Sequence, residues 1–156
     1  LAFLGEAGRE LRVFDFASYW AREVLTRSDA PQGRVPGRAV LHPTCSLTKL
    51  GAVSDFLSVA KAHAEDPVVP LRAGCCGFAG HHGFTQPEIT EGATRAEAED
   101  VKSLATEAGQ VSVNAYSTCR TCEIGMTRAT GLSYASAAHL VYRALGLDRR
   151  QEGTRA

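Results

Sequence analysis

Residues 38–45 read Arg38-Ala39-Val40-Leu41-His42-Pro43-Thr44-Cys45, and this stretch decides the fold that we expect for the whole chain. Its first five residues form an apolar run typical of a buried strand, and the proline ends that run. Residues 46–64 then carry apolar side chains at helical spacing. A strand followed by a helix is the repeating unit of a parallel sheet with helices packed on it.

The same alternation continues along the chain. Apolar periodicity predicts helices over residues 16–27, 87–108, 119–130 and 137–145, and short strands over 12–15, 67–71, 111–115 and 132–134. Glycines and prolines predict loops over 28–37 and 74–84. We therefore expect an α/β fold with a small parallel sheet. A single domain should cover residues 1–148, and residues 149–156 should be a disordered tail.

Charge and hydropathy exclude several classes of protein. The 17 basic residues equal the 17 acidic ones, so the chain lacks the basic footprint of a nucleic-acid binder or of a protein that docks on anionic lipid. No apolar run has the length of a transmembrane helix, and we expect no signal peptide. We expect a cytoplasmic protein, or one peripheral to the inner membrane face. The first residue is Leu1 and the only methionine is Met126, which indicates a fragment of a larger protein.

Five cysteines occur in the pattern C-x29-CC-x42-CxxC. They are Cys45, Cys75, Cys76, Cys119 and Cys122, and we call them the thiol cluster. An odd count argues against a disulfide framework, and adjacent cysteines rarely bond to each other because the peptide between them would be strained. The pattern therefore favours a reduced compartment and metal or redox chemistry.

Each group of cysteines follows a predicted strand. Cys45 comes after residues 38–42, the Cys75-Cys76 pair after 67–71, and the Cys119–Cys122 motif after 111–115. In parallel sheets, sites lie in the loops beyond the carboxyl ends of the strands. We therefore expect the whole thiol cluster to meet at one edge of the sheet.

The types and spacing of these residues indicate a soft metal centre. The CxxC motif places two thiolates one helical turn apart, at a helix start that favours negative charge. Gly74, Gly77 and Gly80 let the backbone approach a bulky inorganic ligand and donate amide hydrogens to it. Thiolates select zinc or iron–sulfur clusters, and both structural zinc and a regular cubane take four ligands. Five cysteines therefore point to an irregular or larger cluster, unless one of them is simply a buried side chain.

Three stretches together resemble a known family. They are His42-Pro43-Thr44-Cys45, Gly74-Cys75-Cys76-Gly77-Phe78-Ala79-Gly80 and Thr118-Cys119-Arg120-Thr121-Cys122. They resemble the cysteine-rich CCG domain of heterodisulfide reductases, of lactate-utilisation and glycolate-oxidase iron–sulfur proteins, and of the membrane-anchoring component of anaerobic glycerol-3-phosphate dehydrogenase. The resemblance covers residues 40–141, and residues 119–134 are similar to the C-terminal end of FAD-linked D-lactate dehydrogenases.

This resemblance implies that the thiol cluster holds a [4Fe–4S] centre, non-cubane in the heterodisulfide reductase case, or zinc in some copies. It implies an electron-transfer domain of an FAD-linked oxidoreductase of 2-hydroxy acids such as D-lactate or glycolate. FAD and ferredoxin-like modules would lie in the rest of the parent protein, and the electron acceptor is not indicated. No catalytic residue is expected here, so the fragment alone should be inactive. The alternatives are a structural zinc domain of the same enzyme and a thiol–disulfide module that uses Cys119 and Cys122.

Four further residues could lie around such a centre. His42 ends a predicted strand and could approach the metal, although a hydrogen-bonded structural histidine is the interpretation that we favour. His81 and His82 follow the glycine loop as ligands, proton donors or exposed side chains. Arg120 lies between two cysteines and is a candidate for the surroundings of the metal. The charge run over residues 95–100 is expected to be the solvated face of a helix.

Overall fold

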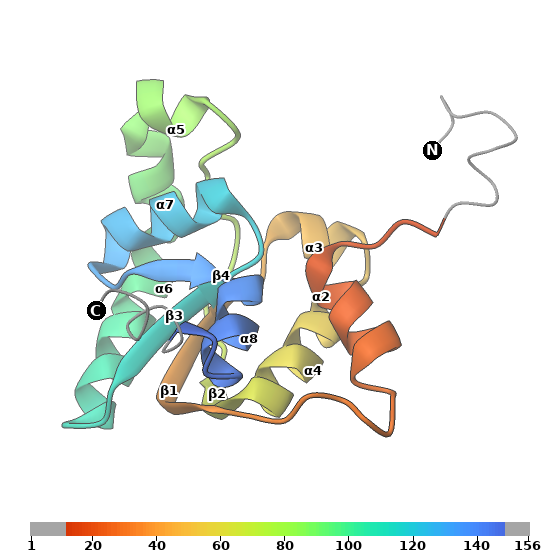
Figure 1. Ribbon diagram of the computed structural model, residues 1–156. Coiled ribbons are helices and arrows are strands. Elements are labelled where there is room, and N and C mark those ends of the chain that lie inside the picture. The colour runs from red at the N-terminus through yellow and green to blue at the C-terminus, as the bar shows by residue number, and fades with distance from the viewer. Residues whose placement is uncertain (1–11, 149–156) are drawn as a thin grey trace, which may run out of the picture.

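A computed structural model describes residues 12–148, which form a parallel β-sheet with helices on both faces (Figure 1). The sheet in this range has four strands in the order β2-β1-β3-β4. These strands are β2 (Ala64–Val68), β1 (Val35–His42), β3 (Val113–Ser117) and β4 (Tyr134–Ser136). All their pairings are parallel, so the expected α/β fold is confirmed. Residues 1–11 of the expected domain and the expected tail, 149–156, lie outside the described residues.

The helices form two layers, one on each face of the sheet (Figure 1). One layer contains α2 (Phe16–Tyr19), its continuation as the π-helix η2 (Trp20–Val24), α4 (Val53–His63) and α8 (Ala137–Ala144). The other contains α6 (Pro87–Ala108) and α7 (Arg120–Thr130). Two short helices, α3 (Cys45–Lys49) and α5 (His82–Thr85), lie in connections. Within residues 12–148, none of the helices is long and apolar enough to cross a membrane.

The central strands are apolar on both faces because both faces are covered. Ala39 and Leu41 of β1 belong to a core shared with α4 and α8, whereas Val40 points into a core shared with α6 and α7. Successive side chains of a strand point to opposite faces, so a continuous apolar run is what a doubly covered strand requires. The second core also contains the side chains of Cys76 and Cys122.

The register brings the strand ends together at one edge. His42 is opposite Ser117, which in turn is opposite Ser136, and Val40 is opposite Val68 at the end of β2. The Ser117 hydroxyl donates a hydrogen bond to the carbonyl oxygen of His42 at 3.1 Å. The connections that leave these strands, which carry the cysteines, therefore start from the same edge of the sheet.

Several predicted elements need correction. Residues 12–15 are not a strand: the Asp15 side chain instead caps α2 by accepting from the amides of Ala17 and Ser18. The single helix expected over 46–64 is in fact two helices, α3 and α4. Gly51 has a φ of 65°, a left-handed conformation that interrupts a right-handed helix. The strand expected over 67–71 is β2, which begins and ends three residues earlier.

Gly37 provides a test of how tightly β1 is held. Its φ is 83°, and an added Cβ would lie 2.3 Å from the carbonyl oxygen of Ser112. We expect Gly37→Ala to lower the free energy of unfolding by about 1–3 kcal/mol, because both the left-handed backbone and the contact oppose a side chain. Urea denaturation measures this change.

Gly92 is the matched control. It lies on α6, and an added Cβ would meet no atom within 4 Å. Gly92→Ala should therefore raise the free energy of unfolding by about 0.5–1 kcal/mol through helix propensity. Equal effects of the two substitutions would contradict this account of β1.

Candidate metal centre

Three connections carry the thiol cluster at the carboxyl edge of the sheet. Cys45 is the first residue of α3, which follows β1. The Cys75-Cys76 pair lies in the connection between β2 and α5. Cys119 is the N-cap of α7 and Cys122 is the third residue of that helix. All five belong to the described part of the chain, where each is a free thiol.

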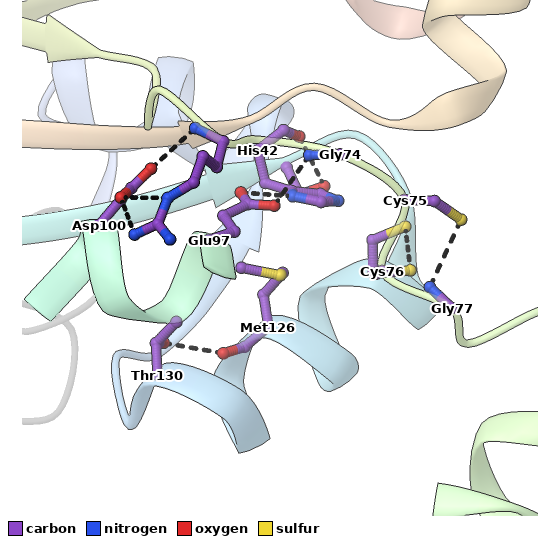
Figure 2. A network of polar contacts seen from close by, with 12 residues as sticks. His42, Gly74, Cys75, Cys76, Gly77, Glu97, Asp100, Met126 and Thr130 are labelled. Carbon is purple, nitrogen blue, oxygen red and sulfur yellow. Dashed lines mark hydrogen bonds and ion pairs between the residues drawn. The ribbon is translucent and has the colours of Figure 1, made fainter. Parts of the chain in front are cut away.

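One close sulfur–sulfur contact and several electrostatic interactions link the members of the cluster. The Sγ atoms of Cys76 and Cys122, which we call the buried pair, are 2.9 Å apart (Figure 2). Cys122 also interacts with Cys119. Cys45 and Cys75, which we call the exposed pair, interact with each other, and Cys45 also interacts electrostatically with Cys76. The structure thus places the five cysteines near one another, with two shielded from solvent and two facing it, but of the described cysteines only Cys76 and Cys122 belong to a group compact enough to hold a metal ion.

Hydrogen bonds hold the cysteine connections in place. Thr44 caps α3 by accepting from the amide of Leu47, and its hydroxyl is 3.2 Å from that of Thr118. The connection after β1 is therefore tied to the one after β3. The amide of Gly77 donates to Cys75 Sγ at 3.4 Å.

The three predicted glycines have different roles. Gly77 has a φ of 66°, and an added Cβ would lie 2.8 Å from the Cβ of Ala93, so both conformation and space require glycine. The Gly74 amide donates to Glu97 Oε2 at 3.2 Å. Gly80 has a φ of 69° but open space around it, so its role is to turn the chain.

His42 lies between the thiol cluster and α6. The side chain is fully buried, and its Nδ1 is 2.8 Å from Oε1 of Glu97, which is 2% exposed (Figure 2). One atom each of His42, Cys76 and Cys122 all lie within 4.8 Å of one another. Nitrogen and thiolate sulfur are the usual zinc ligands in proteins. These three residues form a group that could hold a metal ion.

The charges of this group are strongly shifted. The contact between Cys76 and Cys122 lowers the pKa of Cys76 to about 4. Burial acts in the opposite direction, whereas the interaction with His42 lowers this pKa further. The same contact and burial raise the pKa of Cys122, so the buried pair shares one proton. Burial alone would lower the pKa of His42, but Cys76 and Glu97 outweigh it and raise the pKa to about 9. Without metal, the site therefore contains a thiolate beside an imidazolium.

The pKa values of Cys45 and Cys119 are shifted by other causes than those of the buried pair. Burial and the neighbouring Cys75 raise the pKa of Cys45. Burial opposes ionisation of Cys119, but hydrogen bonds from Thr121 and from backbone amides of the helix start lower its pKa. The expected effect of the helix start on thiolates thus applies to Cys119, whereas Cys122 stays protonated because Cys76 carries the charge.

The other predicted surroundings lie farther out. His81 and His82 are exposed, with their rings stacked at a centroid distance of 4.3 Å. Arg120 is exposed and pairs with Glu123 at 2.7 Å across one turn of α7. The contacts described for these three residues involve neither the cysteines nor His42.

Glu97 is the residue that the sequence analysis missed. The charge run over 95–100 was expected to be solvated, and for Glu97 that prediction is wrong. The signal was present in the spacing, since Thr90, Thr94, Glu97 and Val101 form one buried stripe along α6. Glu97 lies in that stripe, where a buried carboxylate requires partners such as His42 and the Gly74 amide.

An open groove adjoins the exposed pair. Its volume is about 510 Å³, and Cys45 and Cys75 lie in its wall together with Lys49. The remaining wall is largely apolar, formed by residues that include Val53 and Leu71. The cluster is therefore accessible from one side through this groove, whose wall includes one positively charged side chain, that of Lys49.

The thiolate at Cys76 is testable in reduced, metal-free protein. Ultraviolet absorbance should detect a thiolate that persists as the pH falls from 9.0 to about 4, and Cys76→Ser should lack it. Because the folded-state pKa lies below that of an ordinary thiol, the thiolate also stabilises the fold increasingly as the pH rises above about 4. Above about pH 6.5 the raised pKa of His42 acts in the opposite direction, because the folded protein keeps a proton that the unfolded chain releases. It therefore offsets the stabilising effect of the Cys76 thiolate.

Cys45→Ser is the matched control, because Cys45 has a raised pKa and should not contribute a thiolate in this range. It should leave the absorbance unchanged. The same low-pH titration in Cys76→Ser as in the unsubstituted protein would contradict the assignment.

Comparisons with known proteins do not identify a family for this chain. Searches of family models, of curated proteins and of solved structures found no significant match to the chain. The metal-binding capacity of the site therefore rests on the side chains described above.

Proposed function

We propose that the thiol cluster holds an iron–sulfur centre and that the chain is the electron-transfer domain of an FAD-linked 2-hydroxy-acid oxidoreductase. The observation that carries this proposal is the meeting of five free thiols, from three connections, at one edge of the sheet. Cys45, Cys75, Cys76, Cys119 and Cys122 would hold the group. When bound, it would accept and release single electrons.

The donor set fits such a group. Thiolates are soft ligands, and five of them exceed the four that a structural zinc ion takes. Lone cysteines are often merely buried, but Cys45 and Cys75 are exposed, so burial does not explain them. The left-handed glycines at 77 and 80 let the chain turn around the cluster.

The surroundings suit electron transfer. The buried pair shields one side of the centre from water, while the exposed pair faces the open groove. Solvent exposure and hydrogen bonds to sulfur are two means by which a protein tunes a cluster's potential, and the Gly77 amide supplies one such bond. An electron partner would approach from the groove side.

The assignment to 2-hydroxy-acid oxidation is supported by the sequence motifs. The stretches at 42–45, 74–80 and 118–122 resemble the CCG domain, which occurs in enzymes that oxidise lactate and glycolate. Hydride removal from such substrates needs a flavin or nicotinamide cofactor. We propose that FAD in another module of the same enzyme removes the hydride and passes single electrons on to this domain.

A structural zinc site is the second candidate, and one observation favours it. The ligand atoms of His42, Cys76 and Cys122 lie within 4.8 Å of one another, a group that could hold a single metal ion, and imidazole nitrogen with thiolate sulfur is a usual ligand set of zinc. In that case the ion would fix the connections without carrying electrons.

The first test is the metal content of protein purified without oxygen. We expect a brown protein with iron and acid-labile sulfide, because the thiolates outnumber the ligands of zinc. Cys76→Ser and Cys122→Ser should lose most of the iron, since serine offers a hard oxygen in place of a soft thiolate. His82→Gln, at an exposed site, should keep it. A colourless protein with stoichiometric zinc and no sulfide would refute the iron–sulfur proposal.

The second test is redox activity. Dithionite should bleach the visible absorbance reversibly, while the chain alone should not oxidise D-lactate with an artificial acceptor. The reason is that its sequence contains no dinucleotide-binding fingerprint. Turnover of D-lactate by this chain would show that hydride chemistry occurs here, contrary to the proposed role.

A further inference from the structure

A buried chain of polar contacts joins the Gly74 amide, Glu97 of α6 and His42 (Figure 2). The amide of Gly74 donates to one oxygen of Glu97, and the other oxygen is 2.8 Å from Nδ1 of His42. Both side chains are nearly inaccessible to solvent, at 2% and 0% exposure. The carboxylate therefore holds the hydrogen on Nδ1 and fixes how the imidazole ring is turned.

The far side of this ring is unsatisfied. Nε2 of His42 is fully buried and makes no hydrogen bond of normal geometry to the residues described, although the side chain interacts with the nearby Cys76 thiol. One ring nitrogen of His42 and the sulfur atoms of Cys76 and Cys122 lie within 4.8 Å of one another, and since Nδ1 is bonded to Glu97, Nε2 is the nitrogen free to reach the sulfurs. A buried polar atom without a partner is destabilising. Such an atom, aimed at two thiols, is what a ligand position looks like before the metal is bound.

A purely structural histidine would be expected to look different. His63, elsewhere in the fold, is also buried, but its Nε2 accepts from the indole of Trp20 at 2.9 Å and its Nδ1 is 3.1 Å from the carbonyl of Gly33. Both of its ring nitrogens are satisfied within the chain. In His42 only the nitrogen facing away from the sulfurs is satisfied.

We propose that His42 binds the metal through Nε2 and that Glu97 is its positioning residue. This inference rests on the proposed metal-binding role of the thiol cluster, and it makes the centre a mixed one of cysteine and histidine. Metal-ligating histidines commonly donate their other N–H to a carboxylate, which orients the ring and raises its basicity. A neutral imidazole also carries less negative charge than a thiolate, and in Rieske centres such replacement raises the reduction potential.

The decisive measurement detects nitrogen bound directly to the metal. Full-length protein labelled with 15N-histidine and reduced without oxygen should show, by pulsed electron paramagnetic resonance, the strong nitrogen coupling of a direct ligand. The coupling should disappear in His42→Gln and remain in His82→Gln. An iron–sulfur signal without strong nitrogen coupling would overturn the inference while leaving the proposed function intact.

Cobalt(II) provides an assay that does not depend on iron. We expect Glu97→Gln to weaken Co²⁺ binding to reduced apoprotein about 10–100-fold. Glutamine still accepts from Nδ1 but removes the charge, and circular dichroism would verify that the variant is folded. A role limited to tying β1 to α6 would lower the melting temperature without changing the affinity.

The two proposals can fail separately. If no iron cluster forms but Co²⁺ binding depends on His42 and Glu97, the electron-transfer role is wrong and the inference stands. If His42→Gln binds Co²⁺ as tightly as His82→Gln does, the inference is wrong, whatever the iron content.

Discussion

The parallel pairing of β1 with both β2 and β3 is the constraint on which the site depends. Because the strands run in the same direction, the connections that follow them start at one edge, and these connections carry all five cysteines. An antiparallel β2 would send the Cys75-Cys76 connection to the opposite edge. Cysteines that are far apart in sequence therefore become neighbours only after long-range strand pairing has formed.

The alternation of strands and helices was predictable because the long elements have unmistakable patterns. The 22-residue α6, closed by Gly109, agrees with its prediction, and α7 begins one residue later than expected. Short elements were less predictable, since a few apolar residues fit several structures. Residues 12–15 are apolar enough for a strand, but Asp15 uses its carboxylate to cap a helix. Gly51 breaks a continuous helical pattern by its backbone conformation alone.

The positions of the cysteines could be derived from the sequence, because each follows a strand. Their surroundings could not be derived in the same way. Glu97 lies in a charged stretch, and only the turn of α6 decides that this one carboxylate faces inward. Its partner His42 is 55 residues away, so no local pattern joins them. Arg120, in contrast, is exposed, and its partner Glu123 lies one helical turn along α7, so a local sequence pattern does join this pair.

The two cores of the domain are not equivalent. The core shared with α4 and α8 contains none of the five cysteines, whereas the one shared with α6 and α7 includes Cys76 and Cys122. A metal bound there would tie α7 to the connections that follow β1 and β2, and none of the proposed ligands would come from α4 or α8. Its loss would lower the local opening free energy of α7 more than that of α4. Amide hydrogens of the two faces would then exchange at rates that report, separately, on metal occupancy and on the fold.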